Sequence, residues 1–248
     1  MRVEATPPLP AAYDDALTTG LADIGVELTT AARVAIDGHV RLLLAWNRAI
    51  NLTAIRDPVE VAGAHVVDSL AALPVFRERK VDRLVDLGSG GGFPGLPLAI
   101  ALPAKEALLA DSIGKKVRFL ETVVDAVGLA GRVETQTARA ETLARDPAHR
   151  ERWPAVTARA VAALPDLVEL AFPLLQRGGV LVAWKRGEIG SELAAARRAA
   201  AALGGGTLET RSAEVASLAG HCLVVVRKGG PTPDRFPRDP ALRRRSPW

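Results

Sequence analysis

The chain has 248 residues, of which 48% are hydrophobic and 24% charged, and its formal net charge is +4 at pH 7. These values are ordinary for a globular protein with a sizeable core, and the modest positive charge permits a nucleic-acid partner without requiring one. The single cysteine excludes an intramolecular disulfide and a cysteine metal cluster, and the four histidines are scattered, so no metal is expected.

Residues 1–10 show neither the basic stretch nor the apolar segment of a secretory signal. No run approaches the roughly 20 apolar residues of a membrane span. We therefore expect a cytoplasmic protein with no membrane partner.

The first 80 residues predict an all-helical extension. Residues 1–12 are rich in proline, and apolar residues then recur at helical spacing from Tyr13 to Leu73. Thr29 or Thr30 is expected to cap one helix, and Asp57-Pro58 to open another with proline at the first helical position.

From Val81 onward strands and helices alternate, which predicts an α/β sheet that is mostly parallel and covered on both faces. The last two strands lack a helix between them and predict an antiparallel pair. The expected domain, 81–228, precedes a basic tail, 229–248, which is rich in proline and arginine and predicts no regular structure. The strands are expected at 82–87, 106–111, 132–136, 154–159, 179–184, 207–212 and 221–227, and the helices at 95–102, 114–127, 165–175 and 190–202.

A glycine-rich segment, Asp86-Leu87-Gly88-Ser89-Gly90-Gly91-Gly92, follows the first strand. Strand, glycine loop and helix is the layout of a nucleotide-type cofactor site, because glycine lets the backbone take positive φ and approach a ligand. A dinucleotide fingerprint needs glycine at the sixth loop position, which is Phe93 here. Glycines at alternate positions after an acidic residue resemble instead the first motif of class I S-adenosylmethionine (SAM) methyltransferases. The alternative is a tight turn with no ligand.

Other residues near expected strand ends suit the same cofactor. Asp86 is placed to neutralise the ammonium group of SAM, directly or through water. Asp111 ends the second strand and can accept both ribose hydroxyls, or cap the next helix. The pair Ala140-Glu141 follows the third strand, where an adenine edge would lie, although alone this signal is weak. Arg159 ends the fourth strand, and open α/β sheets bind ligands at the carboxyl ends of their strands. The alternative to a ligand contact is a salt bridge between Arg159 and an acid such as Asp86.

The sequence offers no obvious catalytic side chain. Enzymes of this fold that methylate exocyclic amines commonly carry an Asn/Asp-Pro-Pro-aromatic motif after the fourth strand, where this chain has Arg159-Ala160-Val161-Ala162. Methylation at C5 of a pyrimidine needs a cysteine nucleophile, but Cys222 begins an apolar strand and is expected in the core. The sequence leaves open a methyl acceptor that is already nucleophilic, such as a ring nitrogen, which needs no catalytic side chain.

Basic residues lie beside the expected site. Lys115 and Lys116 are on the helix after Asp111, and Lys185 and Arg186 follow the fifth strand. These four side chains can contact RNA phosphates, although a solvated face explains each of them equally well.

At this point the chain resembles one family, the bacterial small-subunit ribosomal RNA methyltransferase G family, formerly called glucose-inhibited division protein B. The resemblance runs from about residue 42 to the tail and combines the glycine loop with short motifs that are particular to this family. These motifs are Trp46-Asn47-Arg48, Asn51-Leu52-Thr53, Arg56-Asp57-Pro58, His65, Asp68-Ser69-Leu70, Phe93-Pro94-Gly95, Asp111-Ser112, Lys115-Lys116, Phe119-Leu120, Arg139-Ala140-Glu141, Thr157-Ala158-Arg159-Ala160 and Trp184-Lys185.

The resemblance implies a Rossmann-like class I SAM-dependent methyltransferase fold with a seven-stranded sheet. It implies methyl transfer from SAM to N7 of one guanine in the 530 loop of 16S ribosomal RNA, without a general base. It places cofactor contacts at Gly88, Phe93, Asp111, Ala140, Glu141 and Arg159, and the glycine-loop motif itself adds Gly90.

The partner implied is 16S ribosomal RNA or the small ribosomal subunit, and we expect a monomer. The tail resembles the family's ending, but Asp239 and Pro240 depart from it, which puts a contact between tail and RNA in doubt. Two alternatives remain: a SAM methyltransferase with another RNA or protein acceptor, and a SAM-binding RNA or assembly factor without turnover.

Overall fold

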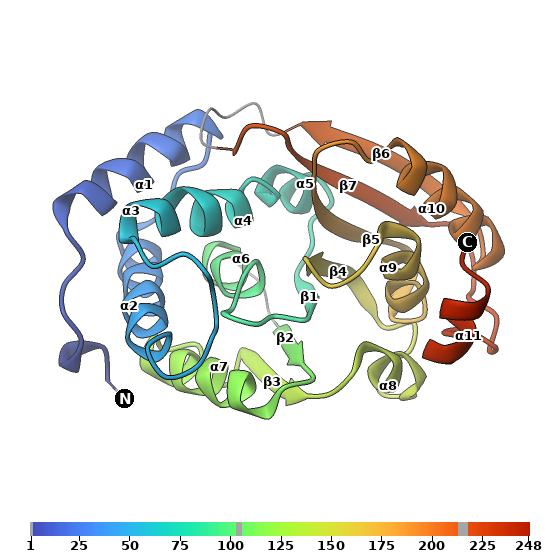
Figure 1. Cartoon of the computed structure of the whole chain (residues 1–248), viewed down its shortest axis with the longest axis horizontal. Coiled ribbons are helices and arrows are strands. Elements are labelled where there is room, and N and C mark those ends of the chain that lie inside the picture. Colours follow the sequence, from blue (N-terminus) through green and yellow to red (C-terminus); the bar gives the residue numbers. More distant parts are fainter. Residues whose placement is uncertain (1, 103–105, 213–217) are drawn as a thin grey trace.

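In the computed structural model, which describes residues 2–102, 106–212 and 218–248, the seven expected strands form one sheet (Figure 1). Their order is β3-β2-β1-β4-β5-β7-β6. The first five strands pair in parallel. The antiparallel pairing of β6 with β7 confirms the prediction for the last two strands, and β7 also pairs antiparallel with β5. The strands are β1 (Arg83–Leu87), β2 (Glu106–Asp111), β3 (Val133–Thr137), β4 (Trp153–Arg159), β5 (Leu175–Arg186), β6 (Gly206–Ser212) and β7 (His221–Lys228).

The fifth strand begins earlier than the sequence predicts. The helix expected at 165–175 ends at Ala171, and β5 already pairs with Trp153 of β4 at Leu175. Gly178 and Gly179 lie inside this strand, and Gly178 has φ of 80°. Glycines weaken a strand signal, which explains why the sequence placed its start at residue 179.

The helical extension forms as expected, with two well-defined caps. The Thr29 side chain accepts a hydrogen bond from the Ala32 amide at 3.2 Å, and Asp57 accepts one from the Val59 amide at 3.3 Å. The helical elements of this part are η1 (Val3–Ala5), α1 (Ala11–Asp23), α2 (Thr30–Trp46), α3 (Pro58–Val61), the π-helical turn η2 (Ala62–Val67), α4 (Asp68–Leu70) and α5 (Leu73–Glu78).

Each face of the sheet has its own buried cluster. The extension, α6 (Gly95–Ala101) and α7 (Gly114–Ala126) cover one face, where their apolar side chains share a cluster with alternate residues of the strands. The other face is covered by α8 (Ala140–Arg145), α9 (Leu164–Ala171) and α10 (Gly190–Ala202). Figure 1 shows these two groups of helices on either side of the strands. The extension therefore completes the core of the sheet.

One helical run, Pro58–Glu78, is long and apolar enough to cross a membrane by length and composition alone. However, 61% of its most apolar window is buried inside the protein. Val61, Val66 and Leu70 of this run belong to the core between the extension and the sheet. The run is therefore a core element, whose apolar character follows from packing.

The C-terminal segment has regular structure, which corrects the expectation for residues 229–248. The helix α11 (Pro240–Arg245) has Asp239 as its N-cap, whose carboxylate accepts a hydrogen bond from the Ala241 amide at 2.8 Å. The Asp239-Pro240 departure from the family pattern thus starts a helix. Earlier in the segment, Arg238 forms a salt bridge with Glu169, whose side chain is completely buried on α9. The Trp248 indole donates to the same carboxylate at 2.8 Å.

We predict that Glu169→Gln lowers the free energy of unfolding by about 3 kcal/mol, because it breaks a buried ion pair and leaves the Arg238 guanidinium uncompensated. Denaturant unfolding checks this value. Glu209→Gln is the control, since the Glu209 side chain is 49% exposed in its pair with Arg79, and we expect a change within about 0.5 kcal/mol there. Equal effects of the two substitutions would contradict the anchoring of the segment by Glu169.

Candidate active site

The glycine loop lies between β1 and α6 at the carboxyl end of the parallel strands. Gly88, Gly90 and Gly92 all have positive φ, of 70°, 55° and 89°. The amides of Gly88 and Ser89 donate to the Ala110 carbonyl, which fixes the loop to β2. A Cβ built on Gly90 would meet only the Gly88 carbonyl oxygen, at 3.7 Å, so the space above Gly90 is open. A ligand can therefore approach the backbone of the loop closely at Gly90.

Asp86 faces away from that space. Its carboxylate is fully buried and accepts hydrogen bonds from the Thr157 hydroxyl at 2.6 Å and the Gly95 amide at 3.2 Å. Burial raises the pKa of Asp86 from 3.8 to about 6, although these hydrogen bonds oppose the rise. The carboxylate thus connects β1, β4 and the start of α6. In this structure it supports the loop from behind and does not point into the open space.

Asp111 connects the loop to the end of β2. Its two carboxylate oxygens accept from the Gly90 amide at 3.0 Å and the Ile113 amide at 2.9 Å. Each carboxylate oxygen has a second lone pair, so Asp111 can also accept from a ligand hydroxyl. The expected capping role is wrong, because the N-cap of α7 is Ile113 and no side chain caps that helix.

Phe93 is held between two histidines of the extension. Its ring centroid lies 4.6 Å from that of His39 and 4.8 Å from that of His65, and Phe93 is 5% exposed. His39 is completely buried and places Nε2 2.7 Å from the Gly91 carbonyl oxygen, to which it must donate. Its other ring nitrogen has no hydrogen-bond partner among the described residues. Burial lowers the pKa of His39 from 6.5 to about 4.

Arg159 pairs with Asp68 of α4, which corrects the suggested partner Asp86. Its guanidinium donates to the Asp68 carboxylate at 2.8 Å and to the Ala64 carbonyl at 3.2 Å, and it lies 5.4 Å from the Phe93 ring centroid. Asp68 is 3% exposed and also lies 3.0 Å from Nδ1 of His221 on β7. Arg159 is therefore fixed by the extension at the end of β4, beside the glycine loop.

Ala140 and Glu141 begin α8, a short helix that the sequence did not predict. Glu141 forms a salt bridge with Arg243 of α11. Burial raises the pKa of Glu141, but the hydrogen bond and charge of Arg243 outweigh it and hold the pKa below its ordinary value. The position at which the sequence predicts an adenine contact, Glu141, therefore lies next to the C-terminal helix α11.

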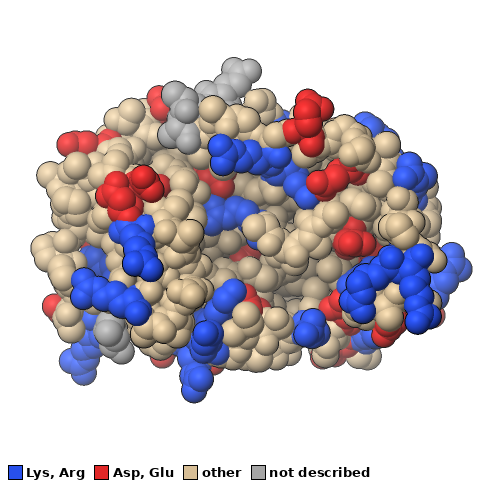
Figure 2. All heavy atoms as spheres, in the orientation of Figure 1, with Lys and Arg blue, Asp and Glu red and all other residues tan. Residues whose placement is uncertain are grey.

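The four predicted RNA contacts fall into two groups. Lys115 and Arg186 are exposed. The Lys116 ammonium lies 3.8 Å from Asp111, and Lys185 forms a 2.6 Å salt bridge with Glu192 and donates to the Ala162 carbonyl. Figure 2 shows Lys and Arg side chains around and within a hollow on this face of the molecule.

The structure thus brings Gly88, Gly90, Phe93, Asp111 and Arg159 to one edge of the sheet. Residue patterns alone gave no role to His39, Asp68 or His221. His65 and Asp68 stand in the family motifs, which was the available signal. His39 and His221 lie far from the glycine loop in sequence, and only the fold brings them near it.

Comparison with known proteins assigns the chain to a family. The family model for rRNA small subunit methyltransferase G matches residues 34–218. The chain belongs to this family. It is 41% identical to the ribosomal RNA small subunit methyltransferase G of Symbiobacterium thermophilum over 95% of this chain and 98% of the relative. It is 44% identical to the enzyme of that name from Roseiflexus castenholzii over 79% of this chain and 83% of the relative.

Solved structures show the same fold at low sequence identity. An O-methyltransferase from Bacillus cereus in complex with SAH aligns with a TM-score of 0.58 and 14% identity, covering 84% of this chain and 95% of that chain. A SAM-dependent O-methyltransferase from Thermotoga maritima aligns with a TM-score of 0.52 and 14% identity, covering 75% of this chain and 71% of that chain. The class I methyltransferase fold is confirmed.

The pKa of His39 leads to a test of the contact between the extension and the loop. Because the unfolded chain binds a proton near pH 6.5 and the native His39 only near pH 4, stability contributed by the neutral ring is lost as pH falls through this window, by about 3 kcal/mol in total. We predict that His39→Gln removes this loss. Unfolding free energies of both proteins at pH 7, 6, 5 and 4 check it.

The difference between the two proteins isolates His39, since other titrating groups, including Asp86, are present in both. Parallel stability curves for the two proteins would contradict the burial of a neutral His39 against the glycine loop.

Proposed function

We propose that the protein transfers a methyl group from SAM to N7 of one guanine in the 530 loop of 16S ribosomal RNA. The observation that carries the proposal is the open face of Gly90, next to Asp111, in a glycine loop whose residues match the family's motif. Open α/β sheets bind ligands at the carboxyl ends of strands where the strand order reverses. Here that point lies between β1 and β4.

The residues present fit SAM. The Gly88 and Gly90 backbone would lie against the cofactor, and Asp111 would accept its ribose hydroxyls. Ala140 and Glu141 would border the adenine. Asp86 would support the glycine loop from behind, because its carboxylate accepts a hydrogen bond from the Gly95 amide. Phe93 would contribute to the cofactor site through its position in the loop. When bound, SAM supplies an electrophilic methyl group on a positively charged sulfur.

The chain's own residues would align the reactants and remove no proton. Guanine N7 has an in-plane lone pair and carries no proton, so it needs no general base. The segment after β4 places an apolar side chain at the loop, because a Cβ on Gly88 would lie 2.6 Å from the nearer methyl carbon of Val161. Arg159, fixed by Asp68, would help to position the guanine base beside the Val161 side chain.

Two alternatives are tested together with the proposal. A SAM methyltransferase with another acceptor would label a different RNA or a protein, and an assembly factor without turnover would bind SAM and label nothing. Incubation with tritiated SAM and purified small ribosomal subunits, followed by mapping of 7-methylguanosine in the 16S RNA, tests the proposal. A parallel incubation with total cellular RNA and protein separates the two alternatives, because only a methyltransferase with another acceptor would label a component there.

We predict that Gly90→Val abolishes SAM binding in calorimetry, because its side chain would occupy the open space above the loop. The substitution also places a branched residue at positive φ, which costs about 1–2 kcal/mol of stability. Gly128→Val is the matched control, since Gly128 has φ of 74° and nothing within 4 Å of a built Cβ. Equal SAM affinity in both variants would place the cofactor elsewhere.

We predict that single-turnover rates at saturating SAM and RNA vary little between about pH 6 and 9, where an essential base would normally titrate. Stopped reactions at each pH, analysed for 7-methylguanosine, check this. A tenfold rise per pH unit that disappears on replacement of one carboxylate, histidine or lysine would show proton removal and argue against N7. His65→Gln is needed beside the pH profile, because burial lowers the pKa of His65 to about 4, and a flat profile between pH 6 and 9 would not by itself exclude His65 as a base.

A further inference from the structure

Two arginines of the helical extension, Arg48 and Arg56, are exposed and make no hydrogen bond or ion pair with any described residue. Both lie in the turn that connects α2 to α3, residues 47–57. This distinguishes them from Lys116 and Lys185, whose ammonium groups are held by carboxylates of the protein itself.

The turn that carries these arginines is fixed by its own polar contacts. The Asn47 side chain accepts hydrogen bonds from the Leu52 amide at 2.8 Å and the Thr53 amide at 3.1 Å, and donates to the Thr53 carbonyl at 2.9 Å. The Thr53 hydroxyl lies 2.7 Å from Nε2 of His65. The backbone of the turn therefore needs little ordering when a ligand binds.

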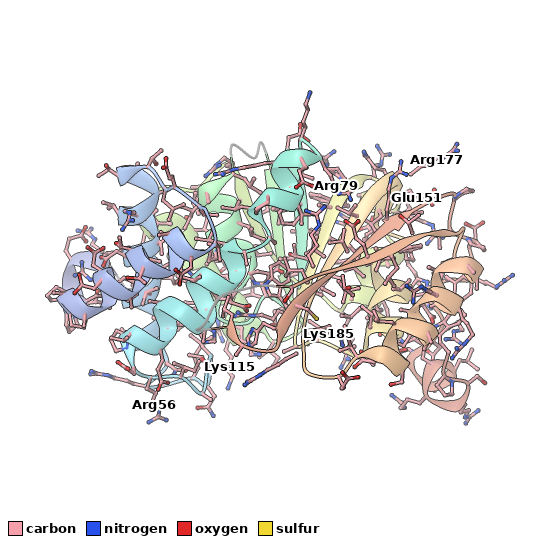
Figure 3. The ribbon with its side chains drawn as sticks, turned by 90° about the horizontal axis from the view of Figure 1, so that it is seen from above. Arg56, Arg79, Lys115, Glu151, Arg177 and Lys185 are labelled. Atoms are coloured by element: carbon pink, nitrogen blue, oxygen red, sulfur yellow. The ribbon has the colours of Figure 1, made fainter. Side chains whose placement is uncertain are left out.

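The turn also lies against the glycine loop. A Cβ built on Gly91 would be 3.6 Å from the Leu52 carbonyl oxygen. Figure 3 shows Arg56, Lys115 and Lys185 on one side of the molecule, the side that faces the viewer in Figure 1, whereas Arg79, Glu151 and Arg177 lie on the opposite side. A chain bound along Arg48 and Arg56 would thus pass close to the cofactor site.

A cavity of about 600 Å³ opens beside these arginines, between the proline-rich residues 5–10 and the end of α2. Its wall combines proline and leucine side chains with polar groups, and Arg48 and Arg56 belong to its lining. Arg41 holds the proline-rich wall in place, because it donates to the Thr6 hydroxyl at 3.2 Å and the Pro7 carbonyl at 3.0 Å. The volume falls within the range of ligand pockets, about 300–1,000 Å³.

We propose that this turn and cavity form a docking site for single-stranded RNA: Arg48 and Arg56 bind two backbone phosphates, and the cavity takes one unpaired base near the methylated guanine. The inference rests on the proposed function. Arginine matches phosphate geometry with paired N–H donors, and proteins read single-stranded RNA through bases that leave the stack. The lining combines proline side chains with polar and charged groups, which suits the base and the phosphate of a nucleotide.

The test compares the wild type with Arg48→Gln/Arg56→Gln, using a 16S RNA fragment that contains the 530 loop. Each phosphate contact on single-stranded RNA contributes a slope of about −0.7 in log affinity against log salt. Between 50 and 200 mM salt, wild-type affinity should therefore fall about sevenfold more than that of the double variant. SAM affinity, measured by calorimetry, should be unchanged, and the KM for RNA should rise.

The charge-matched control is Arg177→Gln/Arg197→Gln, which removes two exposed arginines from elsewhere on the molecule; it should keep the wild-type salt slope. Ala45→Phe tests the cavity separately, because Ala45 lines it. This variant should lose about tenfold in RNA affinity, the scale of one base stack, with the salt slope unchanged.

A double variant that keeps both the wild-type salt slope and the KM for RNA overturns the inference while leaving the proposed function intact. Wild-type affinity for RNA in Ala45→Phe overturns the assignment of a base to the cavity. A wild type that binds SAM and methylates no ribosomal RNA overturns the proposed function, and this inference with it.

Discussion

The architecture of the site depends on one buried carboxylate. Asp86, at the end of β1, accepts hydrogen bonds from Thr157 on β4 and from the Gly95 amide at the start of α6. It thus holds together the two strands between which the strand order reverses and the helix that follows the loop. Gly95 must be glycine, because a Cβ there would lie 2.7 Å from the Asp86 carboxylate and 2.4 Å from Leu109.

The helical extension supplies the other half of the site. His39 and His65 enclose Phe93, and Asp68 holds Arg159 at the end of β4. The π-helical turn η2 contributes to this, since the Ala64 carbonyl within it also accepts from Arg159. Because Phe93 and Arg159 are each held by side chains of another element, they would lose little rotamer entropy when a ligand binds. The extension therefore determines the positions of Phe93 and Arg159 beside the glycine loop.

The C-terminal segment is anchored to the folded domain by ion pairs and is not a free basic arm. Arg238 and Arg243 neutralise Glu169 and Glu141, so the two arginines are not available as RNA contacts in this conformation. Glu141 lies at the position expected for the adenine edge. The segment thus packs α11 against α8 through the ion pair of Arg243 and Glu141, and the net positive charge of the segment overstates its free positive surface.

By itself the sequence determined the alternation of strands and helices along the chain, the antiparallel ending, the family and the glycine loop, whereas the order of the strands within the sheet came from the structure. Each of these depends on local patterns: alternation of apolar residues, glycine spacing and short motifs such as Asp111-Ser112. The tertiary structure alone decided the partner of Arg159, the burial of Asp86, the position of His39 beside Phe93 and the internal ion pairs of Lys185 and Arg243. These contacts join different elements of the fold: Arg159 and Asp68 are 91 residues apart, whereas Lys185 and Glu192 are 7 apart but lie on β5 and α10. An arginine has the same local pattern whether it meets a carboxylate of the protein or a phosphate of a ligand, and only the packing of helices on the sheet determines which of the two it can reach.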